Sequence, residues 1–220
     1  MQNALNTTAS SKWVCVALND LQQLKALQGT FNEAPYKQPP TQPVLYFKPR
    51  NTWNVDGATI DAPVGEPLVV GASIAVIIER ECCRVSADQA LDYVVGYRLL
   101  HDFSLPEQSY YRPDIKGKCL DGSAPLSEAQ LAVTAIDTPN SLVVTTDVNG
   151  VRVAEQSVSQ LHRNINTLIE AVSHIMTLQP GDLIAVGFPG ERIALQPGDQ
   201  VKSEIVGHIA LTNSVGELSA

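Results

Sequence analysis

Apolar residues fill the segment 68–78 (LVVGASIAVII) almost without interruption. A strand with one face in water alternates apolar and polar residues, whereas an unbroken apolar run suits a strand that is buried on both faces. Shorter apolar runs at residues 13–18 and 44–48 predict two more strands. The prolines at positions 35, 39, 40 and 43 lie between these two runs and predict an extended loop, because proline lacks the backbone N–H that helices and sheets use.

A second group of apolar runs predicts more strands in the C-terminal half. Residues 142–148 and 151–153 flank Asn149-Gly150, and Asn-Gly between two β-rich runs is the strongest hairpin signal in this sequence. Residues 183–187 and 201–206 predict further strands. The sequence LQPGD precedes each of them, and we interpret this repeat as a reused Pro-Gly turn rather than a duplicated domain.

Helical spacing occurs in three segments. Asp20 with Gln23, and Ser86 with Gln89, have the spacing of a capping box, which predicts a short helix after Asp20 and another over residues 86–93. The clearest helix is predicted over residues 157–176, where the apolar residues fall on one face: Val158, Leu161, Ile165, Leu168, Ile169, Val172, Ile175 and Met176.

Many short strands, few helices and long loops predict a mixed α+β fold that is mostly β. The 220 residues suit one large domain or two small ones. We divide the chain into an N-terminal α/β portion with the Pro-rich connection (1–65), a β core (66–213) and a loose tail (214–220).

Composition narrows the classes of function. The net charge of −8 argues against a nucleic-acid partner, which needs clustered Lys and Arg, but it allows an anionic small molecule in a locally positive pocket. Residues 1–11 lack the apolar run of a signal peptide, and no apolar stretch approaches the length of a membrane span. The four cysteines lack the CxxC spacing of zinc sites. We therefore expect a cytoplasmic protein with no membrane partner.

Polar and aromatic groups are densest between residues 94 and 122. An apolar run leads to Asp102, a loop carries Tyr110 and Arg112, and Lys118 follows in the segment GKCLDG. A carboxylate at a strand end, followed by a loop with cations and hydroxyls, suits the binding of a small anionic ligand. A solvated surface loop is the alternative, and composition alone does not choose between the two.

This stretch resembles the fumarylacetoacetate hydrolase superfamily. In that superfamily a strand ends in an Asp that binds a divalent metal, and a GK-S-x-D-G segment supplies a Lys to the same pocket; Asp102 and Lys118 stand at those two places. The phrases YFKPRNT, SLPEQSYYRP and LQPGDLIAVG resemble the N-terminal repeat of its two-repeat members that act in homoprotocatechuate (4-hydroxyphenylacetate) breakdown. The resemblance covers residues 13–206 and implies a rolled β-sheet core with a small N-terminal α/β portion packed on it.

The resemblance also implies a magnesium or manganese site made by a Glu-x-Glu pair on one strand and the Asp on another. Gly71 and Ser73 stand where the two glutamates are expected, so only Asp102 remains of the three carboxylates. Hard divalent cations need several oxygen ligands. One carboxylate with waters should hold the metal weakly, and we do not expect a tight metal site of the usual kind.

Other positions also depart from the superfamily pattern. A His and a Glu often form a catalytic dyad on the first short helix, where this chain has Gln23 and Ala26. A Gly-Thr-Pro segment often closes the pocket, and here Phe188 replaces its Thr. The resemblance retains Lys118 and Asp102 as catalytic candidates. It also implies a strand-end Lys near the pocket, for which Lys48 is the candidate, while Tyr110 and Arg112 are candidates for contacting a substrate carboxylate.

The resemblance supports three hypotheses of function. In the first, the chain isomerises or decarboxylates an unsaturated oxo-dicarboxylate, Lys118 binds a carboxylate or polarises the oxo group, and Asp102 holds a weak metal or acts as a base. In the second, the chain is a metal-deficient half that pairs with a separate metal-competent half. In the third, it is another C–C bond hydrolase of the superfamily, since one fold supports several reactions. The family habit implies a homodimer or a heteromer.

Overall fold

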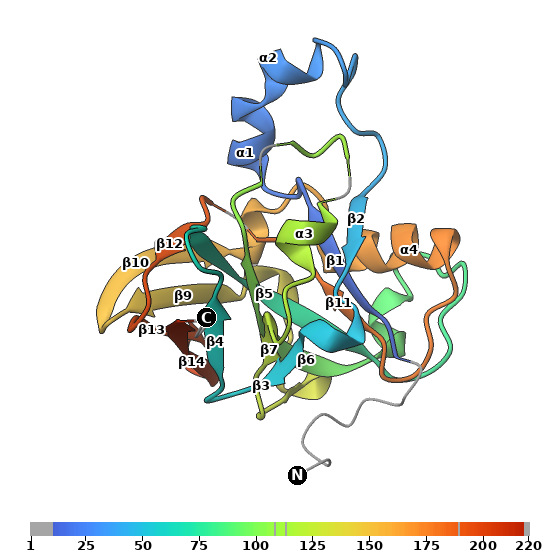
Figure 1. Cartoon of the computed structure of the whole chain (residues 1–220). Coiled ribbons are helices and arrows are strands. Elements are labelled where there is room, and N and C mark those ends of the chain that lie inside the picture. Colours follow the sequence, from blue (N-terminus) through green and yellow to red (C-terminus); the bar gives the residue numbers. More distant parts are fainter. Residues whose placement is uncertain (1–10, 108, 113, 189, 218–220) are drawn as a thin grey trace.

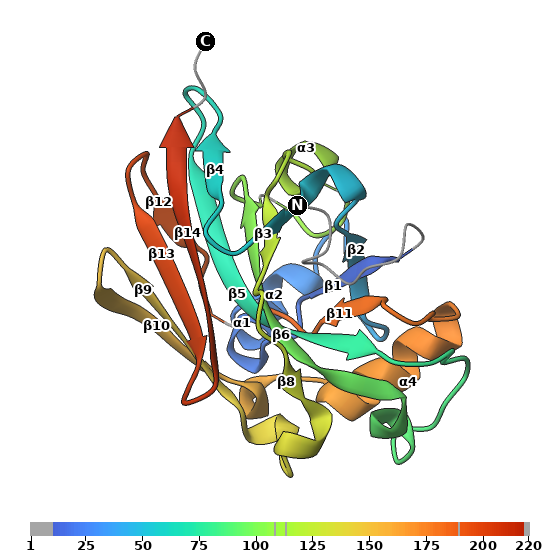
Figure 2. The same ribbon diagram turned by 90° about the horizontal axis from the view of Figure 1, so that it is seen from below.

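The computed structural model describes residues 11–107, 109–112, 114–188 and 190–217, which form two curved sheets (Figures 1 and 2). The larger sheet has the order β2-β1-β11-β5-β6-β7-β3, with β12 also paired to β5 and β8 to β6. Its strands are β1 (Trp13–Ala17), β2 (Val44–Phe47), β3 (Trp53–Val55), β5 (Leu68–Ile78), β6 (Val94–Ser104), β7 (Ala124–Leu126), β8 (Leu131–Ala132), β11 (Leu183–Ala185) and β12 (Ile193–Leu195).

The smaller sheet has the order β10-β9-β13-β14-β4. Its strands are β4 (Thr59–Ala62), β9 (Val143–Val148), β10 (Val151–Ser157), β13 (Gln200–Ile205) and β14 (Ile209–Glu217). The helices are α1 (Leu21–Ala26), α2 (Gln28–Phe31), α3 (Ile115–Lys118) and α4 (Ile165–Ile175), with short 3-10 turns at Arg50–Thr52, Ala90–Tyr93, Val133–Ala135, Pro139–Ser141 and Val158–Gln160. These mostly β elements confirm the predicted fold class.

The central pair β5 and β6 organises the larger sheet, and Figure 2 shows it running between the smaller sheet and α4. Alternate residues of β5 enter different apolar clusters. Ile74 and Val76 pack with α4 and the smaller sheet, whereas Ala75 packs on the opposite face with Trp13 and Leu100. The predicted burial of β5 on both faces is therefore confirmed.

The predicted hairpin is also confirmed. Val148 and Val151 face each other across the β9–β10 turn, and both turn residues have positive φ: 51° at Asn149 and 79° at Gly150. That backbone twist matches the twist of the two strands, and Asn and Gly adopt it at low cost.

Two of the predicted helices are shorter than their patterns indicated. The helix expected over residues 157–176 is α4 alone, preceded by a 3-10 turn. Between them the backbone is extended at Leu161, which pairs with Asp20, and the His162 N–H donates to the carbonyl of Asn19. This pairing across the chain uses backbone groups that a continuous helix would need, and Asn164 then caps α4.

The helix expected over residues 86–93 is only a 3-10 turn, Ala90–Tyr93. The Ser86 hydroxyl donates to the side-chain oxygen of Gln89 rather than accepting from a backbone N–H, so the predicted capping box does not form.

The loose tail expected over residues 214–220 is wrong for residues 214–217. These residues continue β14 and pair in parallel with β4, from Ser214 opposite Thr59 to Glu217 opposite Ala62. Val215 is 3% exposed and packs with Ile60, so burial of this side chain holds the strand in place. Strands from residues 13–62 belong to both sheets, so the N-terminal portion shares its hydrogen bonding with the β core.

Within the residues described, no helix combines the length and apolar character that crossing a bilayer requires.

A buried polar network joins the two sheets at His101 of β6, whose side chain is fully buried. Its Nδ1 lies 2.9 Å from Oδ1 of Asn213, and its Nε2 lies 2.8 Å from the hydroxyl of Ser203. The Asn213 amide nitrogen donates to two backbone carbonyls, so its Oδ1 accepts from a protonated Nδ1. Burial lowers the pKa of His101 to about 4, since the charged imidazolium would be desolvated.

We expect the protein to lose stability as the pH falls from about 6.5 to about 4. The folded pKa of His101 lies below its unfolded value, so the unfolded chain binds more protons in this window. This one group then contributes a slope of at most about 1.4 kcal/mol per pH unit. In urea titrations at stepped pH, His101→Gln should show a shallower slope, and His174→Gln on the exposed face of α4 should keep the wild-type slope. Equal slopes for His101→Gln and the wild type would contradict the assignment.

Candidate active site

Four side chains meet around the fully buried carboxylate of Asp102 on β6. The Lys48 Nζ lies 2.6 Å from Oδ1, and the Arg192 Nη2 lies 2.9 Å from Oδ2. The Tyr46 hydroxyl donates to Oδ2 at 2.6 Å, and the Lys118 Nζ lies 3.5 Å from the same oxygen. We call Asp102 and these four residues the Asp102 cluster.

Four separate parts of the chain bring the cluster together. Strand β2 carries Tyr46 and ends just before Lys48, and α3 ends at Lys118. Asp114 caps α3 by accepting from the Gly117 N–H at 2.9 Å. A Cβ on Gly117 would collide with the Asp114 carboxylate, which explains why glycine precedes Lys118.

The cluster keeps Asp102 ionised. Burial by itself would raise the pKa of this carboxyl group, but the charges of Lys48, Lys118 and Arg192 outweigh burial and hold the pKa well below its usual range. In turn the Asp102 charge raises the pKa of Arg192 against the effect of its own burial. Asp102 is therefore a weak base, and its role as an anchor for cations fits the geometry better than proton abstraction.

The two lysines of the cluster differ in how tightly they are held. Lys48 is fully buried and forms an ion pair with Asp102, and its ammonium group donates hydrogen bonds to the carbonyls of Phe103 and Lys118 and to the hydroxyl of Ser123. These acceptors use its whole donor capacity. Lys48 was predicted to bind substrate; its geometry favours the positioning of Asp102.

Lys118 has longer contacts than Lys48. Its Nζ lies 3.5 Å from Asp102, 3.5 Å from the Ser104 hydroxyl and 3.4 Å from Glu107, and its side chain is 5% exposed. Burial raises the pKa of Glu107, although the charges of Lys118 and Arg192 act in the opposite direction. A cavity-lining carboxyl group whose pKa burial raises, beside a Lys with long contacts, is a candidate for proton transfer.

A cavity of about 690 Å³ lies beside Arg192 of the cluster. Residues of α1 and of the loop that follows β6 line it, and Figure 1 shows these two segments near each other. Glu107, Phe188 and Arg192 line it, and from α1 so do Gln23 and Ala26, where the superfamily dyad was expected. Tyr110 also lines the cavity, and its hydroxyl accepts from the Gln23 amide at 2.8 Å. Tyr110 therefore lies at the cavity, and its contact with a substrate carboxylate stays a prediction.

Arg112, the other loop residue predicted to bind substrate, is exposed. The guanidinium that reaches Asp102 belongs instead to Arg192, in a segment 90 residues away. Arg192, Tyr46 and Glu107 were not among the site residues predicted from the sequence. Tyr46 could have been found by strand periodicity, since it shares a face of the β2 segment with Lys48. No local motif marks Arg192.

The residues present do not fit a divalent metal. Gly71 pairs with Asp102 across β5 and β6, and Ser73 follows on the same face, so neither expected glutamate is there. The Asp102 carboxylate is already surrounded by three cations. Across the described part of the chain, no group of three or more His, Cys, Asp or Glu side chains is arranged to hold a metal ion.

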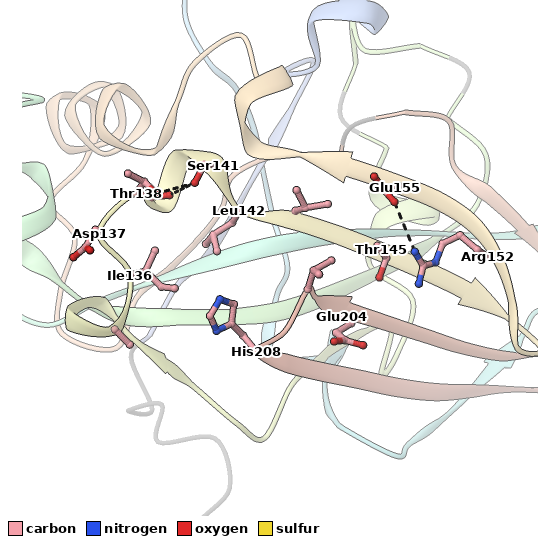
Figure 3. A pocket seen from close by; sticks show the side chains of 13 residues that line it. Ile136, Asp137, Thr138, Ser141, Leu142, Thr145, Arg152, Glu155, Glu204 and His208 are labelled. Carbon is pink, nitrogen blue, oxygen red and sulfur yellow. Dashed lines mark hydrogen bonds and ion pairs between the residues drawn. The ribbon is translucent and has the colours of Figure 1, made fainter.

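A second hollow, of about 660 Å³, lies over β9, β10 and β13 (Figure 3). Its described lining includes none of the Asp102 cluster. Its charged side chains are exposed or half-buried, and Arg152 is paired there with Asp147 and Glu155. Exposed pairs of this kind are weak and well screened, so the hollow lacks the desolvated charges that catalysis uses.

The family model for the fumarylacetoacetate (FAA) hydrolase C-terminal domain matches residues 12–216. The chain belongs to this family. A 4-hydroxyphenylacetate degradation bifunctional isomerase/decarboxylase of Escherichia coli is 40% identical over 200 residues. That alignment covers 91% of this chain but 46% of the relative, so the chain spans about half the length of the curated relatives it matches.

Solved structures agree with the family assignment. A 5-carboxymethyl-2-hydroxymuconate delta-isomerase from Mycobacterium smegmatis superposes with a TM-score of 0.80 at 28% identity, covering 96% of this chain and 80% of that one. A maleylpyruvate hydrolase from Sphingobium, in complex with manganese and pyruvate, has a TM-score of 0.76 at 22% identity, with 94% of this chain and 70% of that chain covered. The second likeness shows the fold alone.

We expect Lys48→Met to destabilise the protein by about 3–5 kcal/mol, because it leaves a buried carboxylate without its best-held partner. The matched variant Lys118→Met should cost less, because its contacts with Asp102 and Glu107 are 3.4–3.5 Å long. Urea unfolding at pH 7 measures both. Adding Asp102→Asn to Lys48→Met should recover part of the loss, and equal losses for the two lysines would contradict the proposed difference between them.

Proposed function

We propose that this chain is an isomerase/decarboxylase component of 4-hydroxyphenylacetate (homoprotocatechuate) breakdown. Its substrate would be an unsaturated oxo-dicarboxylate, either 2-hydroxyhepta-2,4-diene-1,7-dioate or 5-carboxymethyl-2-oxo-hex-3-ene-1,7-dioate. One observation carries the proposal: a cavity lined by Arg192 of the positively charged Asp102 cluster, in a chain 40% identical to a bifunctional isomerase/decarboxylase of this degradation.

The charges of the site support an anionic substrate. Lys48, Lys118 and Arg192 carry three positive charges, and Asp102 and Glu107 carry two negative ones, which leaves an excess of one positive charge. The excess rises when Glu107 takes up a proton. Although the whole chain has a net charge of −8, the wall of this cavity attracts carboxylates.

Lys118 and Glu107 divide the chemistry in this proposal. In decarboxylation the bond between a carboxylate carbon and its neighbour breaks, the electron pair moves into the conjugated oxo group, carbon dioxide leaves, and the neighbouring carbon later takes a proton. Lys118 stabilises the negative charge that develops on the oxo oxygen. Glu107 supplies the proton, and in isomerisation it removes a proton at one position of the conjugated system and returns it at another.

We expect Glu107→Gln to lower kcat by about 10²–10⁴, the usual contribution of a general acid or base, with little change in KM. Lys118→Ala should raise KM and lower kcat, because Lys118 contacts both the ground state and the developing oxyanion. Both variants should keep a melting temperature within a few degrees of the wild type. Release of carbon dioxide measures decarboxylation, and the decrease in ultraviolet absorbance of the dienol measures isomerisation.

The control is Lys116→Ala on the same helix, since Lys116 is exposed and pairs with Glu66 outside the cavity. It should leave both reactions unchanged. Wild-type kinetics for Glu107→Gln would remove Glu107 from the mechanism. Products formed by addition of water across a broken C–C bond would instead indicate a hydrolase of the same family.

The absence of both expected glutamates at Gly71 and Ser73 favours a second candidate function. In it the chain is a non-catalytic half that pairs, as a heteromer, with a metal-competent half. The purified chain alone would then turn over neither substrate, and activity would require a homologous second chain. Turnover by the purified chain in the presence of EDTA excludes this candidate.

A further inference from the structure

Two departures from the family pattern lie next to each other in space. Gly71 stands opposite Asp102 in the β5–β6 pair, so a side chain at position 71 would project from the same face as Asp102. A Cβ built on Gly71 would lie 2.5 Å from the Arg192 Nη1 and 3.1 Å from the Phe188 ring. The space of the expected glutamate is therefore filled by the Arg192 guanidinium.

Phe188 explains how the guanidinium is held there. The Arg192 Cζ lies 4.3 Å from the centre of the Phe188 ring, which is 9% exposed. Nη1 donates to the Asp102 backbone carbonyl at 3.2 Å, and Nη2 donates to the Asp102 carboxylate. Because position 71 has no side chain, there is space for the guanidinium. The Phe188 ring, which stands in place of the family's threonine, provides a surface on which the guanidinium stacks.

We propose that the Arg192 guanidinium takes the place and the positive charge that a divalent metal has in metal-dependent members of the family, so that this chain binds a 2-oxo carboxylate through Arg192 and Lys118 without a metal. This inference rests on the proposed function for the class of ligand. It concerns equilibrium binding, however, and does not require that the chain turn over a substrate.

The exposure of Arg192 fits a residue that meets a ligand. Its side chain is 23% exposed and lines the cavity, whereas the Lys48 side chain is fully buried. Two of its five N–H groups donate to Asp102, which fixes the plane of the guanidinium. A guanidinium held in one plane matches the two oxygens of a carboxylate, and the Lys118 Nζ, 3.5 Å from the same Asp102 Oδ2, would receive the neighbouring oxo oxygen.

The first test is calorimetric titration of the full chain with 2-oxoglutarate, a stable 2-oxo-dicarboxylate, in EDTA and then in manganese. We expect binding in EDTA with the same affinity in manganese. Arg192→Lys should weaken it about 10- to 100-fold, the loss of a charge-assisted hydrogen-bond pair. Arg152→Met, which removes an arginine from the hollow on the other sheet, should bind as the wild type does. Binding that appears only with manganese would overturn the inference.

The second test asks whether Arg192 excludes the metal. Gly71→Glu with Ser73→Glu restores the two expected carboxylates, and the triple variant also carries Arg192→Ala. We expect manganese to raise the melting temperature of the triple variant and to leave that of the double variant unchanged. Stabilisation of the double variant by manganese would mean that Arg192 does not fill the metal position, and would overturn the inference.

These outcomes separate this inference from the proposed function. Metal-independent binding of 2-oxoglutarate without turnover of either dicarboxylate would support the Arg192 site and count against the enzyme proposal. Turnover that requires manganese would support the enzyme proposal and count against the metal-independent Arg192 site. If Arg192→Lys fails to fold, Lys118→Met provides the same binding measurement from the other side of the site.

Discussion

The interaction on which this structure depends is the burial of one ionised carboxylate, Asp102, among three cations. A buried charge without partners costs several kcal/mol, so the side chains that compensate Asp102 must be placed by the fold itself. They come from β2 and the residue just after it, from the end of α3 and from the segment after β11. The cluster therefore ties together parts of the chain that are up to 146 residues apart, counting from Tyr46 to Arg192. The long strand pair β5 and β6 provides the rigid base for this cluster.

The three cations of the cluster, Lys48, Lys118 and Arg192, carry the same charge but have different roles. Lys48 is enclosed by oxygen acceptors and acts on Asp102, whereas Arg192 lines the cavity and Lys118 is held by longer contacts with Asp102 and Glu107. Glu107 adds a carboxyl group whose pKa burial raises, while Asp102, a few residues earlier, has its pKa held low. Two carboxyl groups with pKa values moved in opposite directions suit separate tasks: one anchors positive charge, and the other exchanges protons.

The family relationship gives these details their meaning. Members of one fold can keep a strand pair and change the chemistry that it presents, since function resides in the site rather than in the fold. In this chain, Gly71 and Phe188 would look like two unrelated departures from the family pattern if each were considered alone. The structure shows that both contact Arg192, so a lost carboxylate and a gained aromatic ring belong to one rearrangement around Asp102. The proposed metal-independent site follows from that rearrangement.

The sequence by itself determined the fold class, the buried strand β5, the β9–β10 hairpin and the place of Asp102 and Lys118, because each depends on local periodicity, turn chemistry or a short motif. Only the tertiary structure decided where the predicted helix of residues 157–176 begins, since Leu161 pairs with Asp20 from the other end of the chain. The same reason applies to residues 214–217, which form a strand through pairing with β4, and to Arg192, which no motif marks. Contacts between distant segments are decided by which surfaces can be buried together, and that information is spread over the whole chain rather than held in any local pattern.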